Sequence, residues 1–281
     1  MARIPEQLGK LTLARQLGTG RHCQVWEAVD TDTGRRVAVK VVVPEMAKDP
    51  EQRRLLRHEL AVAQSLDFPA IVRIDGFSVA GGLPHLVMEL CPHSNLKKQT
   101  SAGVDEIAPR LHRIIMQVAW ALDHMHGRGW VHRDVKPENV LASAEGEVKL
   151  IDLAIAARRP GVIKRFFGGK VKAQGSPSYI APEQIRGLPV DPRSDIYSLG
   201  CVLFEMLAGM PPYTASTTEE LLHKHLSATP PSVEAFNRNA TASVSKLIRE
   251  MLAKRPADRP ASMKSVVQHI SAIKFLNRVA G

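Results

Sequence analysis

The sequence predicts an α+β fold of two lobes, a small sheet-rich lobe followed by a larger, mostly helical one. Up to about residue 90, short apolar segments alternate with polar residues and are separated by glycines, a pattern typical of antiparallel strands. After Cys91 and Pro92, apolar residues recur at helical spacing instead. We therefore expect the lobes to cover residues 11–90 and 91–277 and to form one domain together.

The first lobe is expected to contain about five antiparallel strands and one main helix. Residues 11–43 alternate in polarity and break at glycines, which indicates three strands, and the apolar segments at 71–77 and 84–90 add two more. Between these groups, residues 50–66 have helical periodicity, with Glu59 beside the apolar face. The expected result is a small sheet with one helix packed on it.

The second lobe is expected to be built from helices. Its longest helical pattern spans residues 107–125 and stops before Gly127 and Gly129, since glycine often ends a helix. Further helical patterns lie at residues 194–208, 217–226, 243–252 and 262–275.

Composition narrows the class of protein. The 281 residues are 44% hydrophobic and 23% charged, which is ordinary for a globular domain. The net charge of +10 favours anionic partners such as nucleotides or acidic proteins; no specific nucleic-acid partner is expected. Three scattered cysteines indicate neither a disulfide framework nor a metal site, and no apolar stretch is long enough to span a membrane. We expect a cytoplasmic protein.

Residues 132–139, with the sequence HRDVKPEN, combine charged groups that core packing does not require. Asp134 can act as a base, and Lys136 can neutralise developing negative charge. Asn139 and Asp152, thirteen positions apart, offer the hard oxygen ligands that Mg²⁺ prefers. Each residue taken singly also fits a turn or a helix cap. Their order and spacing favour phosphoryl transfer.

Lys40 ends an otherwise apolar segment, so its charge requires an anionic partner. Glu59 on the expected helix can supply that partner. A surface lysine and a solvated glutamate are the alternative, because both residue types are mostly exposed. Together with the other motifs, an ion pair that positions phosphate groups is favoured.

Gly18 and Gly20 lie between the first two expected strands. Two glycines there let a turn approach phosphates closely and expose backbone N–H donors. A plain hairpin accounts for such a pair as well, so the turn alone is weak support for nucleotide binding.

Together these motifs resemble those of protein kinases over residues 11–275. The matching elements are the glycine-containing turn, residues 37–40, Glu59, residues 132–139, Asp152 and Ala181-Pro182-Glu183. Lys136 and the segment GSPSY at 175–179 are typical of the Ser/Thr branch, and residues 191–213 resemble the bacterial members called Hanks-type kinases. The resemblance implies transfer of the γ-phosphoryl group of ATP to serine or threonine of protein substrates, with Mg²⁺, or Mn²⁺ in its place, as cofactor.

The resemblance also implies roles for individual residues. Asp134, Lys136, Lys40 and Glu59 would form the catalytic set, and Asn139 and Asp152 would hold the metal. The residues implied to bind ATP between the lobes are Leu17, Gly18, Gly20, Val25, Ala38, Lys40, Met88, Glu89, Cys91 and Leu141. Asp195 would brace the loop at 132–139, and Glu183 would pair with Arg259.

Two positions depart from the family pattern near the expected nucleotide. Cys23 stands where a third glycine is usual. Its neighbours Arg21 and His22 make a reactive thiol possible, but an unreactive small residue is the favoured interpretation. Ala154 replaces the glycine that usually follows the metal-binding aspartate by two positions, and we expect it to narrow conformational switching there. These departures motivate a rival interpretation, a pseudokinase that binds nucleotide as a scaffold.

Residues 155–174 contain no serine, threonine, tyrosine or acidic residue. Their six basic residues are Arg158, Arg159, Lys164, Arg165, Lys170 and Lys172. We expect activity without phosphorylation of this segment. The segment either binds an acidic partner or substrate, or is a solvated basic loop. A small-molecule kinase of the aminoglycoside type is a further rival, although residues 175–183 and the helical C-terminal part favour protein substrates.

Overall fold

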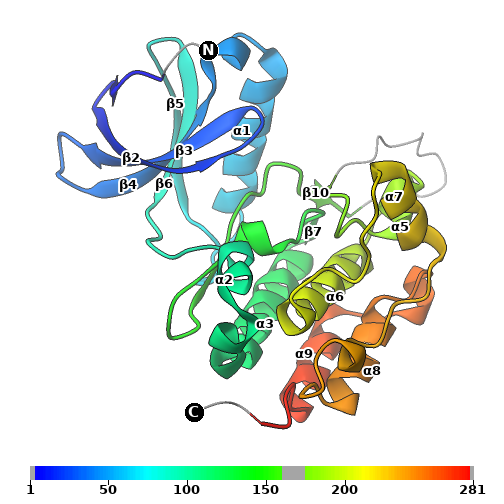
Figure 1. Cartoon of the computed structure of the whole chain (residues 1–281). Helices are drawn as coiled ribbons and strands as arrows, with labels where there is room; N and C mark the ends of the chain where they lie inside the picture. The colour runs from blue at the N-terminus through cyan, green and yellow to red at the C-terminus, as the bar shows by residue number, and fades with distance from the viewer. Residues whose placement is uncertain (1–3, 160–174, 279–281) are drawn as a thin grey trace. The chain divides into compact units, whose positions relative to one another are not determined.

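A computed structural model describes residues 4–159 and 175–278 of the chain, which form two compact units. One unit holds the described residues up to Pro92 together with Asp152–Ala154, and the other holds the described remainder. The first is built around a sheet and the second around helices, so the predicted α+β fold is confirmed (Figure 1). The expected boundary assigned Asp152–Ala154 to the helical lobe. These residues belong with the sheet unit because Lys40 and Glu59 bind them.

The first unit contains a six-stranded antiparallel sheet with the order β1-β2-β3-β4-β6-β5. Its strands are β1 (Gln7–Leu8), β2 (Leu11–Thr19), β3 (Cys23–Asp30), β4 (Arg36–Val42), β5 (Ile74–Ala80) and β6 (Leu83–Glu89). Five of the six correspond to the expected segments. The two-residue strand β1 was not expected because it is too short to carry a periodic pattern.

The helix of the first unit is α1 (Pro50–Gln64), preceded by a 3₁₀ turn at Pro44–Met46. Asp49 caps it by accepting a hydrogen bond from the N–H of Glu51, and Pro50 occupies the first helical position, where proline is favoured. The inner face buries Leu56, Val62 and also Glu59. A buried carboxylate on this face requires a cation nearby.

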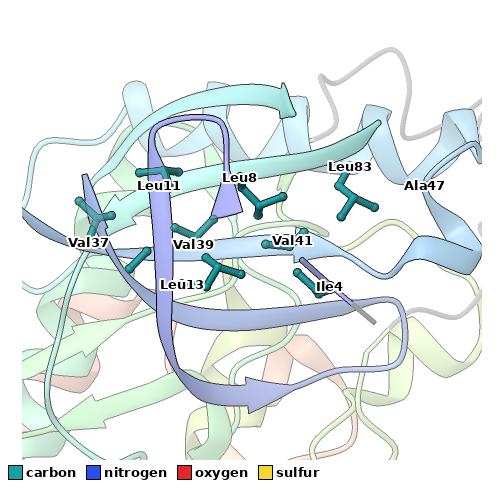
Figure 2. Close-up of a cluster of buried hydrophobic side chains, with 10 residues drawn as sticks. Ile4, Leu8, Leu11, Leu13, Val37, Val39, Val41, Ala47 and Leu83 are labelled. Atoms are coloured by element: carbon teal, nitrogen blue, oxygen red, sulfur yellow. The ribbon is translucent and has the colours of Figure 1, made fainter. Parts of the chain in front are cut away.

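An apolar cluster joins the start of the chain to the sheet (Figure 2). Ile4 and Leu8 are buried against Leu13 and Val41, and the cluster continues to Leu83. The first lobe therefore begins before residue 11, where the sequence analysis placed its boundary. The buried apolar side chains that precede β2 are part of the core of the first lobe. Each large one stabilises the fold by about 1.5–3 kcal/mol.

The second unit is mainly helical: three of its helices pack on the long helix α3, and a fourth packs on one of these three (Figure 1). The helices are α2 (Leu96–Ala102), α3 (Val104–Gly127), α5 (Pro182–Ile185), α6 (Pro192–Ala208), α7 (Thr218–Ser227), α8 (Ala242–Met251) and α9 (Met263–Ala272). Short 3₁₀ turns lie at Pro137–Asn139, Val233–Ala235 and Pro256–Asp258. Two small two-stranded sheets pair β7 (Trp130–Val131) with β10 (Ala157–Arg158) and β8 (Val140–Ala142) with β9 (Val148–Leu150). None of the helices within the described ranges has both the length and the apolar character needed to cross a bilayer.

Helix α6 is the core of the second unit. From Ser194 to Leu207 every residue is buried, so the helix has no solvent face and packs against α3 and α8. Gly200 makes the approach to α8 close: a Cβ there would lie 2.9 Å from Cβ of Met251 and 3.2 Å from Leu252. The contact requires a residue without a side chain.

A buried polar group lies beside the same helix. The hydroxyl of Tyr197 and Nδ1 of His225 are 2.8 Å apart, and Nζ of Lys254 donates to the carbonyl of His225 and to the hydroxyl of Tyr213. Burial, together with the nearby charge of Lys254, lowers the pKa of His225 to about 4. The histidine is therefore neutral in the folded protein at physiological pH.

We expect Gly200→Ala to lower the free energy of unfolding by about 1–3 kcal/mol, because the added methyl group overpacks the contact with α8. The midpoint of urea unfolding measures this change. Gly127→Ala is the matched control, since no heavy atom lies within 4 Å of its added Cβ. It should leave stability unchanged or raise it by up to about 1 kcal/mol. Equal effects of the two changes would contradict the packing argument.

His225 should also make the free energy of unfolding depend on pH. The unfolded chain binds a proton at His225 below about pH 6.5 while the folded chain resists it down to about pH 4, so stability falls as the pH drops through this window. The contribution of one histidine is about 3 kcal/mol over that range. His225→Asn, which keeps a polar atom near Nδ1, should flatten the dependence of unfolding free energy on pH between 6.5 and 4. An unchanged slope would show that other groups cause it.

Candidate active site

In the first unit, one cation holds two carboxylates together. Lys40 on β4 donates from Nζ to Oε2 of Glu59 at 2.8 Å and to Oδ1 of Asp152 at 2.9 Å. The second oxygen of Glu59 accepts a hydrogen bond from the N–H of Leu153 at 3.3 Å. The expected Lys40–Glu59 ion pair is therefore formed, and it extends to the aspartate that was expected to bind metal.

The side chains of Lys40, Glu59 and Asp152 are exposed to different extents, and this affects their charge and their access to solvent. The side chain of Glu59 is 1% exposed and that of Lys40 is 15% exposed, whereas that of Asp152 is 37% exposed. Burial disfavours the charge on Lys40, but the charges of Asp152 and Glu59 outweigh it and raise the pKa of the lysine. Lys40 is thus a permanent cation, and Asp152 is the partner with access to solvent. The backbone of Asp152 has a φ of 65°, so its position is imposed by its contacts.

The glycine-containing turn connects β2 and β3. Gly20 donates its N–H to the carbonyl of Cys23 at 2.8 Å, and a Cβ on Gly20 would lie 3.3 Å from that oxygen. Burial raises the pKa of the Cys23 thiol to about 11, because it outweighs the opposing charge of Lys40. The structure therefore agrees with the unreactive residue that the sequence analysis favoured and not with a reactive thiol.

The residues expected around the nucleotide are distributed over both units. Leu17 and Gly18 are on β2, Val25 on β3, Ala38 on β4, and Met88 and Glu89 on β6, with Cys91 after that strand; Leu141 is on β8 of the second unit. Pairing of β4 with β6 aligns Ala38 with Met88, both buried. The N–H of Glu89 donates to the carbonyl of Arg73, so only its carbonyl oxygen suits a ligand. The sequence analysis assigned Glu89 to nucleotide binding without distinguishing its N–H from its carbonyl.

In the second unit, residues 132–139, hereafter the catalytic loop, surround the carboxylate of Asp134. Nζ of Lys136 donates to Oδ2 of Asp134 at 2.6 Å, and the N–H and hydroxyl of Ser176 both donate to Oδ1 at 2.9 Å. Lys136 also donates to the hydroxyl oxygen of Ser176 at 2.8 Å. The aspartate thus binds an alcohol hydroxyl that also contacts a cation. Sequence reasoning missed Ser176 as part of this arrangement; its place in the GSPSY segment was the available signal.

Asn139 is oriented by the same loop. Its Nδ2 donates to the carbonyl of Asp134 at 2.9 Å and to Oδ2 of that residue at 3.2 Å. This use of the amide nitrogen leaves the amide oxygen as the atom that suits a hard cation. The N–H of Ile151 donates to the carbonyl of Asn139 at 2.9 Å, and Asp152 follows Ile151 directly in the chain. The two proposed ligands are therefore linked through one backbone hydrogen bond and one peptide bond.

A buried carboxylate on α6 holds the backbone of the catalytic loop. Asp195 is fully buried and accepts hydrogen bonds from the N–H groups of His132 and Arg133, both at 2.8 Å, and from Nε2 of His126 at 2.8 Å. Burial disfavours its charge, but the hydrogen bond and charge of His126 and the other contacts hold the pKa of Asp195 below its usual value. Arg133 has a φ of 71°, which these bonds maintain. The expected bracing contact is present.

A second buried ion pair fixes the segment that carries Ser176. Arg259 donates from its two terminal nitrogens to both oxygens of Glu183, at 2.8 and 2.9 Å, in the expected pair. Tyr179 donates to Glu205 at 2.6 Å, and Lys97 occupies the other oxygen of Glu205 at 2.6 Å. The region after residue 175 is thereby tied to α6 and α2.

The basic segment is only partly described. Arg158 on β10 lies over the ring of Trp130, 4.2 Å from its centroid, and donates to the carbonyl of Arg128. Because Arg158 is engaged in these contacts, it is less available to bind the acidic partner that the sequence analysis considered for this segment. Arg159 is exposed; Lys164, Arg165, Lys170 and Lys172 lie outside the described residues.

The chain belongs to the protein kinase family, because its residues 11–270 match the protein kinase domain. The sheet unit with its polar group around Lys40 and the helical unit with its polar group around Asp134 agree with that membership. Within that family it is similar to bacterial Ser/Thr kinases of the Hanks type. It is 32% identical over 273 residues to a probable serine/threonine-protein kinase of Streptomyces coelicolor, covering 95% of this chain and 40% of that protein. It is 35% identical over 251 residues to serine/threonine-protein kinase PknB of Mycobacterium tuberculosis, covering 88% and 40%. PknH of the same organism is 34% identical over 261 residues, covering 93% and 41%.

The chain spans about two fifths of the length of these curated relatives. Most of the shared part is the kinase domain, because residues 11–270 of this chain match that domain and the alignments cover 88–95% of the chain.

We expect Cys23 to be alkylated slowly. With a pKa of about 11 in place of 9.0, its thiolate fraction near pH 8 falls about a hundredfold, and only the thiolate reacts. Mass spectrometry of the Cys23 peptide after timed iodoacetamide treatment, beside free glutathione, measures the rate. The rate should rise steeply between pH 8 and 11. Reaction as fast as glutathione at pH 8 would contradict the buried-thiol interpretation.

Proposed function

We propose that the chain is an ATP- and Mg²⁺-dependent Ser/Thr protein kinase that transfers a phosphoryl group to protein hydroxyls. The observation that carries the proposal is the contact between Asp134 and the hydroxyl of Ser176. An acceptor serine or threonine presents the same group, so Asp134 and Lys136 have the reach and charges to bind one. Family membership and the named relatives support the same reaction class.

Asp134 would accept the proton of the acceptor hydroxyl as the hydroxyl oxygen bonds to the γ-phosphorus of ATP and the bond from that phosphorus to the leaving ADP breaks. Lys136, within 2.6 Å of Asp134 and 2.8 Å of a bound hydroxyl, would keep positive charge beside the reacting oxygen. Arg133 and His132, held by Asp195, fix the loop so that Asp134 needs little reorganisation.

ATP supplies the transferred phosphoryl group, and Mg²⁺ neutralises its charge. Lys40, held by Glu59, would bind phosphate oxygens, since it is a permanent cation on β4 whose side chain is 15% exposed. Asn139 and Asp152 would hold the metal through the amide oxygen and the carboxylate. Leu17, Val25, Ala38, Met88 and Leu141 would contact the base. The carbonyl of Glu89 and the backbone of Cys91 would bind its polar edge.

Protein substrates are proposed, with acidic ones favoured by the net charge of +10. ATP is abundant in the cytoplasm, where we propose that the domain acts.

The purified chain, incubated with labelled ATP, Mg²⁺ and a generic protein substrate, should transfer label. Asp134→Asn should lower the rate by about a hundredfold or more, because it removes the base. EDTA should abolish transfer, because the proposed reaction requires the metal.

Asp105→Asn is the matched control, since this exposed residue lies in the first turn of α3 and outside the proposed site. It should keep the wild-type rate. Nucleotide binding without any Asp134-dependent transfer, to the chain itself or to the substrate, would favour the pseudokinase instead.

A further inference from the structure

A buried carboxylate on α6 is shared by two other segments of the second unit. The side chain of Glu205 is 1% exposed, and its two oxygens have different partners. Nζ of Lys97 on α2 donates to Oε1 at 2.6 Å, and the hydroxyl of Tyr179 donates to Oε2 at 2.6 Å. Burial and the charge of Glu205 raise the pKa of Tyr179, so its hydroxyl keeps the proton and remains a donor.

Lys97 compensates the charge of that carboxylate. Within the described ranges it is the one ion-pair partner of Glu205, and its side chain is 40% exposed. Its helix is fixed in place: Leu96 is fully buried, and Asn95 caps α2 by accepting from the N–H of Lys98. A buried carboxylate is costly without a cation or several donors. The partly exposed lysine therefore supplies the compensation from the surface.

Tyr179 connects Glu205 to the serine that contacts Asp134. The N–H of Tyr179 donates to the carbonyl of Ser176 at 3.0 Å, which closes a turn, and the hydroxyl of Ser198 donates to the carbonyl of Tyr179 at 2.7 Å. At the other end of this turn, Ser176 donates from its N–H to Oδ1 of Asp134 at 2.9 Å. The place of the buried Tyr179 side chain thus affects where the turn presents Ser176.

Loss of the ammonium group at Lys97 would leave Glu205 with one of its two donors. A carboxylate in that state turns toward water or toward another cation. Glu138 cannot take over, because it is an anion that lies close enough to help raise the pKa of Tyr179. The space that the lysine vacates leads to solvent, since its side chain is partly exposed. The carboxylate would turn that way, and its bond to Tyr179 would break.

We propose that Lys97 is a positioning residue for phosphoryl transfer. It keeps Glu205 bonded to Tyr179. That bond holds the turn at 176–179, which keeps Ser176 against the carboxylate of Asp134. The base is then already ordered when an acceptor hydroxyl arrives. Since Asp134 acts as a base only under the proposed function, the role of Lys97 in transfer rests on that function.

Hydrogen exchange of the Ser176 amide, followed by NMR of the full chain, tests the contact without requiring any transfer. In the wild type this N–H is bonded to Asp134 and should be protected. Lys97→Met should speed its exchange about tenfold or more, because the turn loses a charged anchor. Lys97→Arg keeps a charged donor and should restore protection to within about threefold. Unchanged exchange in Lys97→Met would overturn the proposal.

Transfer of label from ATP to a generic protein tests the consequence for catalysis. Lys97→Met should lower kcat/KM for the protein acceptor about tenfold or more and leave KM for ATP within about twofold, since Lys97 is not among the residues proposed to bind ATP. Rates are compared at equal folded fraction, taken from urea unfolding. An unchanged Lys97→Met rate beside Asp134-dependent transfer by the wild type would overturn this role and leave the proposed function standing. Absence of Asp134-dependent transfer in the wild type would overturn the proposed function instead, and the exchange of the Ser176 amide would still decide whether Lys97 holds the turn.

A charge-compensated variant separates positioning from general damage to the fold. Lys97→Met combined with Glu205→Gln removes the unpaired charge and keeps an oxygen that accepts from Tyr179. The double variant should recover both readouts to within about threefold of the wild type. Recovery of neither would contradict the proposal. Lys98→Met is the matched control, because Lys98 is an exposed neighbour on α2 that forms no ion pair in the described part of the chain, and it should match the wild type.

Discussion

The buried carboxylate of Asp195 is the constraint on which the second unit depends. A charge inside α6 is costly unless hydrogen bonds compensate it, and three donors do so: the N–H groups of His132 and Arg133 and the ring of His126. Two of these donors are backbone groups of the catalytic loop. The loop is thus held by the protein's need to satisfy a buried charge, and Arg133 keeps an unfavourable φ as a result.

The first unit uses the same principle with a buried cation. Lys40 on β4 is compensated by Glu59 from α1 and by Asp152 from a distant part of the chain, so one ammonium group ties three segments together. Glu59 also accepts from the N–H of Leu153. In each unit, an ion whose burial requires partners thus holds distant segments together, while the apolar core around Ile4, Leu8 and Val41 or around α6 supplies most of the stability.

Sequence reasoning predicted the features that are local or that recur as motifs. The five longer strands, α1 and α3 follow from periodicity, and the pairs Lys40–Glu59 and Glu183–Arg259 follow from the family pattern. What it missed depends on contacts between distant residues. The burial that raises the pKa of the Cys23 thiol is one such feature, although the unreactive thiol itself was the favoured interpretation. The stacking of Arg158 on Trp130 and the contact of Ser176 with Asp134 join residues about 30 to 40 positions apart, which no local pattern records. Strand β1 and the short helices α2 and α5 fall below the length at which periodicity is readable.

The bond between Ser176 and Asp134 has a consequence for selectivity between nucleophiles. In an ATP-dependent enzyme, water competes with the protein acceptor, and a base that is open to solvent would activate it and waste the nucleotide. Here Lys136, Asn139 and Ser176 already occupy both oxygens of the carboxylate, and the side chain is only 11% exposed. A water molecule in that position would have to displace ordered donors without offering comparable contacts in return. Under the proposed function, this arrangement keeps water away from the carboxylate of Asp134 and so limits hydrolysis of ATP without transfer to a protein hydroxyl.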